Sequence, residues 1–217
     1  RLEEGIRYAA DNGAQVINLS WGARGYSSTT LAAVQYAISK GAVVATAAAN
    51  AAEEISTENP WFPAVYAKDL NGLISVAATD ANPTSGFPKC GFSNVSNSFV
   101  EIAAPGCDTT VTNSTVGLNG MLSTMRVSTH QGYGYMPGTS MATPHVAAAA
   151  GLVYAYKWSV GLRPTPAQVE DAIMLGSRSQ INLINYVSGG RHLDLNLLML
   201  SLTGADEVPP APTPECP

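Results

Sequence analysis

The sequence predicts an α/β domain with three layers, in which helices cover both faces of a mostly parallel, twisted sheet. Short apolar, β-branched runs alternate with helical patterns, and this βαβ order is typical of parallel strands. The chain has 217 residues, of which 46% are hydrophobic and 12% are charged, so it can bury one sizeable core. We therefore expect one globular domain over 1–203, followed by a Pro-rich linker at 204–217.

The charge balance and hydropathy exclude several classes of function. The net charge is −5 and the pI is near 5.1, which argues against nucleic acid as a partner. No run of Lys or Arg suggests binding to an anionic membrane surface. No stretch approaches the roughly 20 continuous apolar residues that a membrane span needs. The sequence therefore indicates neither a nucleic-acid-binding nor a membrane-spanning protein.

The helices and strands are expected to alternate along the chain. The expected helices cover 2–12, 28–40, the Ala-rich run from 140 onward, 166–173 and 194–200. Thr165 is a plausible N-cap for the fourth of these, with Pro166 in its first turn. The strands expected from apolar, β-branched runs are 15–20, 42–47 and 73–78. A long loop is expected between 51 and 72.

The segment from Gly138 to Ala147 is the strongest candidate for chemistry. A Gly-flanked serine, Ser140, opens an Ala-rich helix, and a helix N-terminus offers unpaired N–H groups and partial positive charge. Pro144 lacks an N–H, so the carbonyl of Ser140 has no partner within the helix. A serine in this setting can act as a nucleophile, whereas the alternative is a serine that only caps its helix.

The motif Gly-Thr-Ser-Met-Ala-x-Pro-His-Val resembles the nucleophile segment of the subtilisin-like serine proteases (subtilases, peptidase family S8). The resemblance implies a subtilisin-like fold in which 91–94 and 100–106 are the last sheet strands. It implies that Ser140 forms an acyl-enzyme, with Thr139 beside it in the substrate site. Ala48-Ala49-Asn50 resembles the Ala-Gly-Asn of that family, which implies an oxyanion hole made by the Asn50 amide and the Ser140 N–H. Ala49 departs from the usual Gly, and an Asn that merely occupies a turn is the alternative for Asn50.

The same resemblance implies that two members of a catalytic triad lie upstream. In that family the order is Asp, His and Ser, and neither the Asp nor the His motif occurs in 1–217. We therefore expect the chain to be the C-terminal part of a peptidase domain. The missing N-terminal part of the same domain is its expected partner. Two alternatives stay open: a catalytically inactive subtilase-like binding domain, and an α/β-hydrolase that uses Ser140, Asp171 and His192. The hydrolase is disfavoured because the residues before Ser140 do not read as a buried strand.

Two other histidines are poor candidates for the base that the serine needs. His145 lies about one turn beyond Ser140 on the same helix and is expected to pack in the core, by resemblance to the family. His130 lies in a Ser/Thr/Gly-rich insert without an acidic neighbour. Neither residue is expected to activate the serine.

The resemblance also implies an extended polypeptide substrate along Ser20-Trp21-Gly22. The P1 side chain, which precedes the scissile bond, would enter a pocket formed by Ala47, Ala48 and Ala49 and by a turn over 61–63 whose proline is cis. Trp61 would fill space in that pocket, which predicts a preference for small or medium apolar P1 residues.

The cysteines and the expected environment complete the sequence-based predictions. By resemblance, Cys90 and Cys107 are expected to lie close together, which leaves Cys216 free or paired elsewhere. A disulfide and the sequons at Asn94 and Asn113 are consistent with a secreted or extracytoplasmic protein. Calcium is a candidate cofactor by resemblance alone, because no compact carboxylate cluster indicates a site. No other cofactor or metal is indicated.

Overall fold

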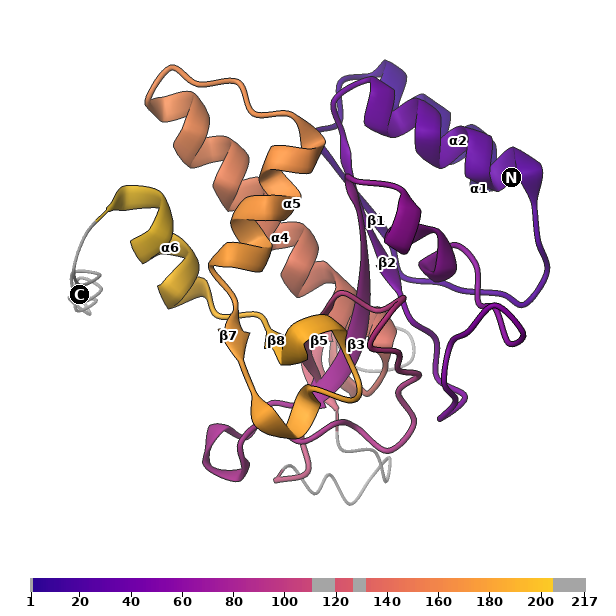
Figure 1. Ribbon diagram of the computed structural model, residues 1–217, viewed down its shortest axis with the longest axis vertical. Coiled ribbons are helices and arrows are strands. Elements are labelled where there is room, and N and C mark those ends of the chain that lie inside the picture. The colour runs from indigo at the N-terminus through magenta and orange to yellow at the C-terminus, as the bar shows by residue number, and fades with distance from the viewer. Residues whose placement is uncertain (1, 111–119, 127–131, 205–217) are drawn as a thin grey trace.

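A computed structural model describes residues 2–110, 120–126 and 132–204 (Figure 1). Its centre is a six-stranded sheet in the order β1-β2-β3-β4-β8-β7. The strands are β1 (Val16–Leu19), β2 (Val43–Ala47), β3 (Leu73–Asp80), β4 (Ile102–Cys107), β7 (Arg178–Ser179) and β8 (Arg191–His192). All neighbouring pairs are parallel except β7 with β8, so the mostly parallel α/β class is confirmed.

Helices cover both faces of this sheet, as expected. They are α1 (Leu2–Asp11), α2 (Ser28–Ser39), α4 (Thr139–Ser159), α5 (Pro166–Leu175) and α6 (Leu195–Thr203). Figure 1 shows α1 and α2 on one side of the strands and α4, α5 and α6 on the other. Successive strand residues alternate between the two sides. Val44 and Leu73 pack into the core cluster beneath α1 and α2, whereas Val43 and Ile74 pack into the cluster beneath α4 and α5.

The helix ends follow the local sequence signals. Thr165 forms a capping box with Gln168 at the start of α5, which confirms the predicted cap. Asp194 accepts hydrogen bonds from the backbone N–H groups of Asn196 and Leu197 at the start of α6. Pro144 lies inside α4, one turn after Ser140.

Three parts of the fold differ from the expectation or were not anticipated. The predicted strand at 91–94 is wrong, because this segment forms turns and its contact with β3 uses a side chain: Ser93 Oγ accepts from the N–H of Ala78 at 2.9 Å. A 3₁₀ helix, Ala64–Asp69, lies within the expected loop. The residues before Ser140 include strand β6 (Tyr133–Met136), but it pairs antiparallel with β5 (Met121–Thr124) outside the central sheet.

The expected proximity of Cys90 and Cys107 is confirmed. They form a disulfide with their Cα atoms 6.2 Å apart, and both residues are buried. Cys107 ends β4 and Cys90 follows the end of β3, so the bond connects the chain near the carboxyl ends of two adjacent strands. Cys216, His130, Asn113 and the linker from residue 205 onward lie outside the described residues.

Candidate active site

Ser140 lies in the first turn of α4 and is hydrogen-bonded to the segment that follows β1. Its Oγ donates to the carbonyl oxygen of Ser20 at 2.9 Å, and the Oγ of Ser20 donates to the carbonyl oxygen of Ser140 at 2.8 Å. The second bond uses the carbonyl that Pro144 leaves without a helical partner. Ser140 is partly exposed, so a ligand can reach its hydroxyl.

Two glycines let the start of α4 lie close to the end of β4. The N–H of Gly138 donates to the carbonyl oxygen of Gly106 at 2.8 Å. A Cβ atom at Gly106 would lie 2.6 Å from Ala78 Cβ and 2.7 Å from the Gly138 oxygen, which is too close for any other residue. The serine is therefore held at the carboxyl edge of the parallel sheet, where ligands of open α/β sheets bind.

Asn50 follows β2 and is tied to the residue before the nucleophile. Its Oδ1 accepts from the backbone N–H and from the hydroxyl of Thr139, both at 2.9 Å. These bonds fix the amide, and the hydrogen bonds of the described residues leave Nδ2 without a partner; this atom lies 3.6 Å from where a Gly138 Cβ would be. The structure thus brings together Asn50, Thr139 and Ser140, three residues that the sequence singled out.

The loop after Asn50 is held by a residue that the sequence analysis did not assign to the site. Asn94 is completely buried, and its Oδ1 accepts from the backbone N–H groups of Ala51 (2.8 Å) and Glu53 (3.1 Å). Its own N–H donates to the carbonyl of Ala49 at 3.0 Å. Because this side chain is buried, the sequon at Asn94 is not an accessible glycosylation site in the fold. The sequence marked it only as part of a sequon and of the expected strand at 91–94.

Both expected walls of the substrate pocket, the end of β2 and the turn over 61–63, lie against Gly22. Gly22 lies opposite the end of β2, since a Cβ built on it would be 3.5 Å from Ala49 Cβ and 3.6 Å from the carbonyl oxygens of Ala47 and Phe62. Ala47 and Ala48 are buried, and Trp21 packs against the core on the α1 side. The Phe62–Pro63 peptide bond is cis, which confirms the expectation for this turn.

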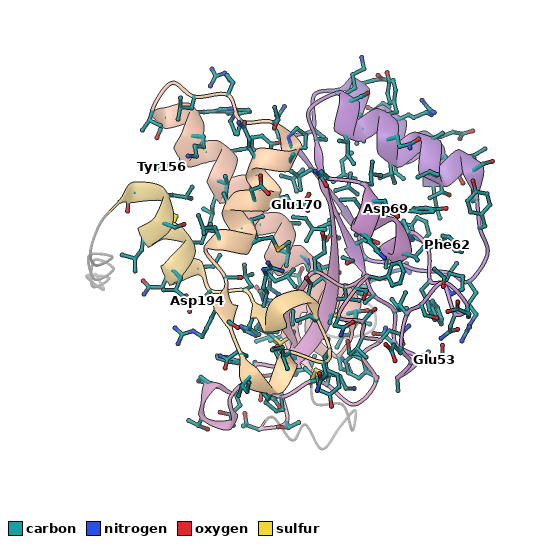
Figure 2. The ribbon with its side chains drawn as sticks, in the orientation of Figure 1. Glu53, Phe62, Asp69, Tyr156, Glu170 and Asp194 are labelled. Carbon is teal, nitrogen blue, oxygen red and sulfur yellow. A yellow bond between two sulfur atoms is a disulfide. The ribbon has the colours of Figure 1, made fainter. Side chains whose placement is uncertain are left out.

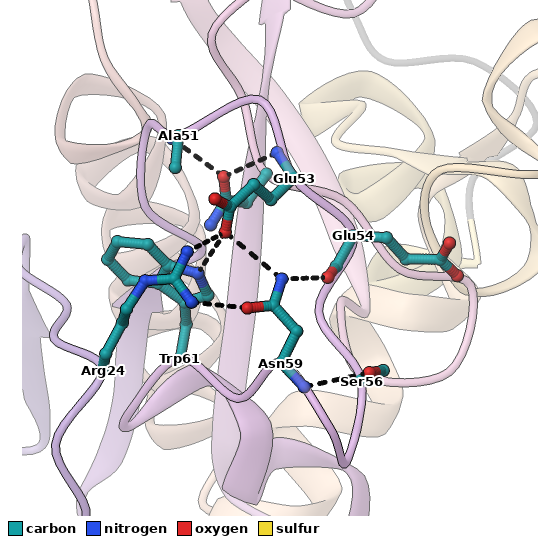
Figure 3. A network of polar contacts seen from close by, with 8 residues as sticks. Arg24, Ala51, Glu53, Glu54, Ser56, Asn59 and Trp61 are labelled. Carbon is teal, nitrogen blue, oxygen red and sulfur yellow. Dashed lines mark hydrogen bonds and ion pairs between the residues drawn. The ribbon is translucent and has the colours of Figure 1, made fainter.

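A polar network surrounds Trp61 beside these walls (Figure 3). The indole Nε1 donates to Glu53 Oε2 at 3.2 Å, and the guanidinium of Arg24 lies over the ring, 4.8 Å from its centroid. Arg24 also forms an ion pair with Glu53 and a hydrogen bond with Asn59. Hydrogen bonds from Asn59 and Trp61 hold the pKa of Glu53 below its usual value, so this carboxylate stays ionised.

The described histidines bond to residues other than Ser140. His192 is buried, its Nε2 lies 2.9 Å from the hydroxyl of Thr79, and its ring stacks on Phe87. Burial lowers the pKa of His192 to about 4. His145 is only partly buried and bonds through Nδ1 to the Met141 carbonyl oxygen at 2.9 Å, so the expectation of core packing is wrong.

The α/β-hydrolase set of Ser140, Asp171 and His192 is thus not joined by the hydrogen bonds of the described residues. Asp171 is exposed on α5. In the described ranges no group of three or more His, Cys, Asp or Glu side chains could hold a metal ion, so calcium stays an untested expectation.

Two acidic side chains outside this site lie close together, Glu170 buried and Glu101 partly buried. Glu170 lies between α5 and the sheet (Figure 2), where it accepts from the N–H of Gly72. Glu101 accepts from the N–H of Ser75 at 3.2 Å. Burial, the charge of Glu170 and a hydrogen bond with it raise the pKa of Glu101 to about 9, and burial also raises the pKa of Glu170.

Comparison with known proteins agrees with this geometry. The Subtilase family model (Peptidase_S8) matches residues 2–189. The chain is 42% identical over 152 residues to thermitase of Thermoactinomyces vulgaris, covering 70% of this chain and 44% of that protein. It is 35% identical over 150 residues to subtilisin E of Bacillus subtilis (strain 168), covering 69% of this chain and 33% of that protein.

A protease from Pseudoalteromonas arctica PAMC 21717 has a similar solved structure. Its TM-score is 0.72 at 29% identity, over 93% of this chain and 58% of that one. The chain thus spans less than half the length of the two curated relatives. The family model covers most of the residues and the solved relative shares the parallel α/β fold, so this chain belongs to the subtilase family.

Proposed function

We propose that residues 1–203 are the C-terminal part of the catalytic domain of a secreted serine endopeptidase, followed by a linker at 204–217. Ser140 is the nucleophile, and the amide of Asn50 and the N–H of Ser140 form the oxyanion hole. The observation that carries the proposal is the pair of hydrogen bonds from Thr139 to Asn50 Oδ1, because they leave Nδ2 available beside the serine.

The chemistry follows from these positions. The Oγ of Ser140 attacks the carbonyl carbon of the scissile peptide, and its proton passes to a histidine of the upstream segment. The negative charge that develops on the former carbonyl oxygen is stabilised by the two oxyanion-hole donors. The histidine then protonates the leaving amine, which leaves an acyl-enzyme on Ser140 that water hydrolyses.

The open edge of the sheet supports an upstream partner segment. Among the described strands, β1 has a neighbour only on its β2 side, so the other edge presents backbone N–H and C=O groups with which a further strand could pair. A groove of about 340 Å³ runs beside it, lined by Leu2, Gly5, Ile6, Ile17, Asn18, Leu19 and Trp21. We propose that the rest of the same domain pairs with β1 and brings the Asp and the His to Ser140.

The disulfide supports an extracytoplasmic location, because such bonds persist in oxidising compartments. No described helix combines the length and hydropathy that a membrane span needs. A polypeptide is the proposed substrate, which would lie extended along Ser20, Trp21 and Gly22 and add a strand to that edge.

The test is labelling with a serine-directed fluorophosphonate. In the full-length protein we expect labelling that Ser140→Ala abolishes, together with hydrolysis of a general protein substrate. The 217-residue chain alone should label at a background rate, since the hydrogen bonds of the two described histidines go to Thr79 and Met141 and not to the serine. An unlabelled full-length protein would instead support the inactive binding domain. Labelling of the short chain that His192→Ala removes would support the α/β-hydrolase.

A further inference from the structure

We propose that Asn94 is a positioning residue for the oxyanion hole: it holds the backbone on both sides of Asn50 and thereby sets where the Asn50 amide lies. This inference rests on the proposed function, because Asn94 acts through the donor assigned there. Thr139 fixes the end of the Asn50 side chain. Asn94 fixes the main chain from which that side chain departs.

Asn94 bonds to the residues immediately before and after Asn50. Its backbone N–H donates to the carbonyl oxygen of Ala49 at 3.0 Å, and its Oδ1 accepts from the N–H of Ala51 at 2.8 Å. The same oxygen accepts from the N–H of Glu53 at 3.1 Å, and Figure 3 shows both N–H groups directed at it. Asn50 therefore lies between two neighbours that are both bonded to one buried residue.

The loop needs this support because two of its residues adopt an unfavourable backbone conformation. Ala49, directly before Asn50, has a φ of 76°, and Ala52 has a φ of 57°. Left-handed conformations are unfavourable for residues with a Cβ atom and persist where surrounding contacts hold them. The N–H of Ala52 donates to the carbonyl oxygen of Phe92 at 2.8 Å, so the segment that carries Asn94 contacts both of these alanines.

Asn94 is in turn held by the central sheet. The neighbouring Ser93 is completely buried, and its Oγ accepts from the N–H of Ala78 in β3 and donates to the carbonyl oxygen of Asn94, both at 2.9 Å. The disulfide between Cys90 and Cys107 ties the same segment to the end of β4. The sheet thus fixes Asn94, and Asn94 fixes the loop after β2.

The other end of the Asn94 amide argues for a role beyond stability. Its Nδ2 is buried, and among the described residues it has no hydrogen-bond partner. A buried donor without a partner lowers the stability of the fold. The contribution of this side chain therefore comes from Oδ1, which accepts from the N–H groups of Ala51 and Glu53.

The experiment is a double-mutant cycle in the full-length enzyme, with kcat and KM measured on one peptide substrate. Asn94→Leu has a side chain of similar size but leaves the N–H groups of Ala51 and Glu53 without their acceptor. We expect it to lower kcat by about 10–100-fold with KM within about twofold, because the Asn50 donor is misplaced. In the Asn50→Ala background the same substitution should change kcat by less than about threefold, since the donor that it positions is already absent.

Ser96→Ala is the matched control. Ser96 is also buried, and its hydroxyl accepts from two backbone N–H groups, those of Ser98 at 3.3 Å and Phe99 at 3.2 Å, neither of which belongs to the loop after β2. This variant should lower the denaturation midpoint but keep kcat within about twofold of the wild type. If Asn94→Leu does not fold, Asn94→Ser enters the same cycle, because its shorter side chain keeps an oxygen acceptor. Its kcat should fall by about 3–10-fold at an unchanged KM.

Active enzyme is counted by fluorophosphonate titration in every variant, so that a loss of folded protein is not read as a loss of kcat. A wild-type kcat in the Asn94 variants, or an equal loss in both backgrounds, overturns this inference alone. A change confined to KM does the same. A wild type that does not label, or an Asn50→Ala variant as fast as the wild type, overturns the proposed function with it.

Discussion

Asn50 and Thr139 are joined by two hydrogen bonds that end on one oxygen, Oδ1 of Asn50, each 2.9 Å long. A side-chain amide held in this way cannot rotate freely, so the direction of its Nδ2, the oxyanion donor that we propose, is set by the fold. Preorganised donors of this kind stabilise the charge of the transition state more than the neutral substrate.

We therefore expect Asn50→Ala to lower kcat of the full-length enzyme with little change in KM. The expected loss is about 10²–10³-fold, the magnitude known for removal of an oxyanion-hole donor in subtilisin. Thr139→Val keeps the backbone bond to Oδ1 and should cost far less. Steady-state kinetics on a good peptide substrate measure both, and a rise in KM at constant kcat would contradict the assigned role.

Ala52 adopts a left-handed backbone conformation, with φ of 57°. This conformation costs a residue with a Cβ atom about 1–2 kcal/mol, whereas glycine adopts it without that cost. Ala52→Gly is thus expected to stabilise the domain by about 0.5–1 kcal/mol. This net gain remains once the greater conformational entropy of glycine in the unfolded chain is subtracted. The neighbouring exposed Ala51, which lacks a positive φ, is the control, and Ala51→Gly should destabilise. Denaturant unfolding of the two variants should give opposite signs.

The disulfide closes a loop with a sequence separation of 17 residues. In the chain-entropy description such a loop stabilises the fold by about 3 kcal/mol. Replacing both Cys90 and Cys107 with Ala should lower the unfolding free energy by about this amount, whereas Cys216→Ser should leave it unchanged. Equal midpoints for the double variant and the wild type would contradict the prediction, as would non-reducing peptide mapping that pairs Cys90 with Cys216.

The carboxyl groups of Glu101 and Glu170 make stability depend on pH. The pKa of Glu101 is raised to about 9 in the folded protein, so its contribution is fully present below the unfolded pKa near 4.5 and is lost as the pH rises through 9. The pKa of Glu170 is raised as well, so this group acts in the same direction. The charge of Arg191 lowers the pKa of Glu101, whereas the charge of Asp171 raises the pKa of Glu170. We expect the unfolding free energy to fall by an amount on the order of 3 kcal/mol between about pH 5 and about pH 8.

Glu101→Gln removes this titration and should flatten the decline and raise stability at alkaline pH. Exposed Glu58 provides the control, since Glu58→Gln should leave the slope as it is. Denaturant unfolding at several pH values measures the slopes. A wild type whose stability rises steadily from acid to alkaline pH would reject the assignment.

His192 contributes in the opposite direction. Burial lowers its pKa to about 4, so the stability that depends on its neutral form is present above the unfolded pKa near 6.5 and is lost as the pH falls through 4. His192→Gln, which can still bond Thr79, should reduce the acid sensitivity. It should also label with fluorophosphonate as fast as the wild type. Slower labelling would mean that His192 assists Ser140.

The parts of the fold that follow local rules were predictable from sequence. The Thr165 cap, the strands before Ser20 and Asn50, and the nucleophile helix each depend on residues within a few positions of one another. Strands β7 and β8 have two residues each, too few to produce a recognisable pattern. The segment 91–94 was wrongly assigned because a serine hydroxyl replaces the backbone hydrogen bond that a strand would make.

The site was predictable where it depends on a contiguous motif and not where it depends on partners far apart in the chain. Ser140 and Asn50 were identified from the motifs around them. Asn94 was not, because its two N–H donors are more than 40 positions away, at separations of 43 and 41 residues. The guanidinium of Arg24 likewise lies over the ring of Trp61 through a tertiary contact, and no local sequence pattern predicts such a contact.

Among the described strands β1 has no partner on its second edge, and this governs how the chain should be handled in solution. Unpaired N–H and C=O groups along a strand can pair with any extended segment, including the same strand of a second copy. Refolded by itself, the 217-residue chain should therefore self-associate as its concentration rises. The upstream segment that we propose, produced separately and added in trans, should compete for that edge. It should keep the chain monomeric and assemble a two-piece enzyme, so that solubility and peptidase activity appear together during the titration.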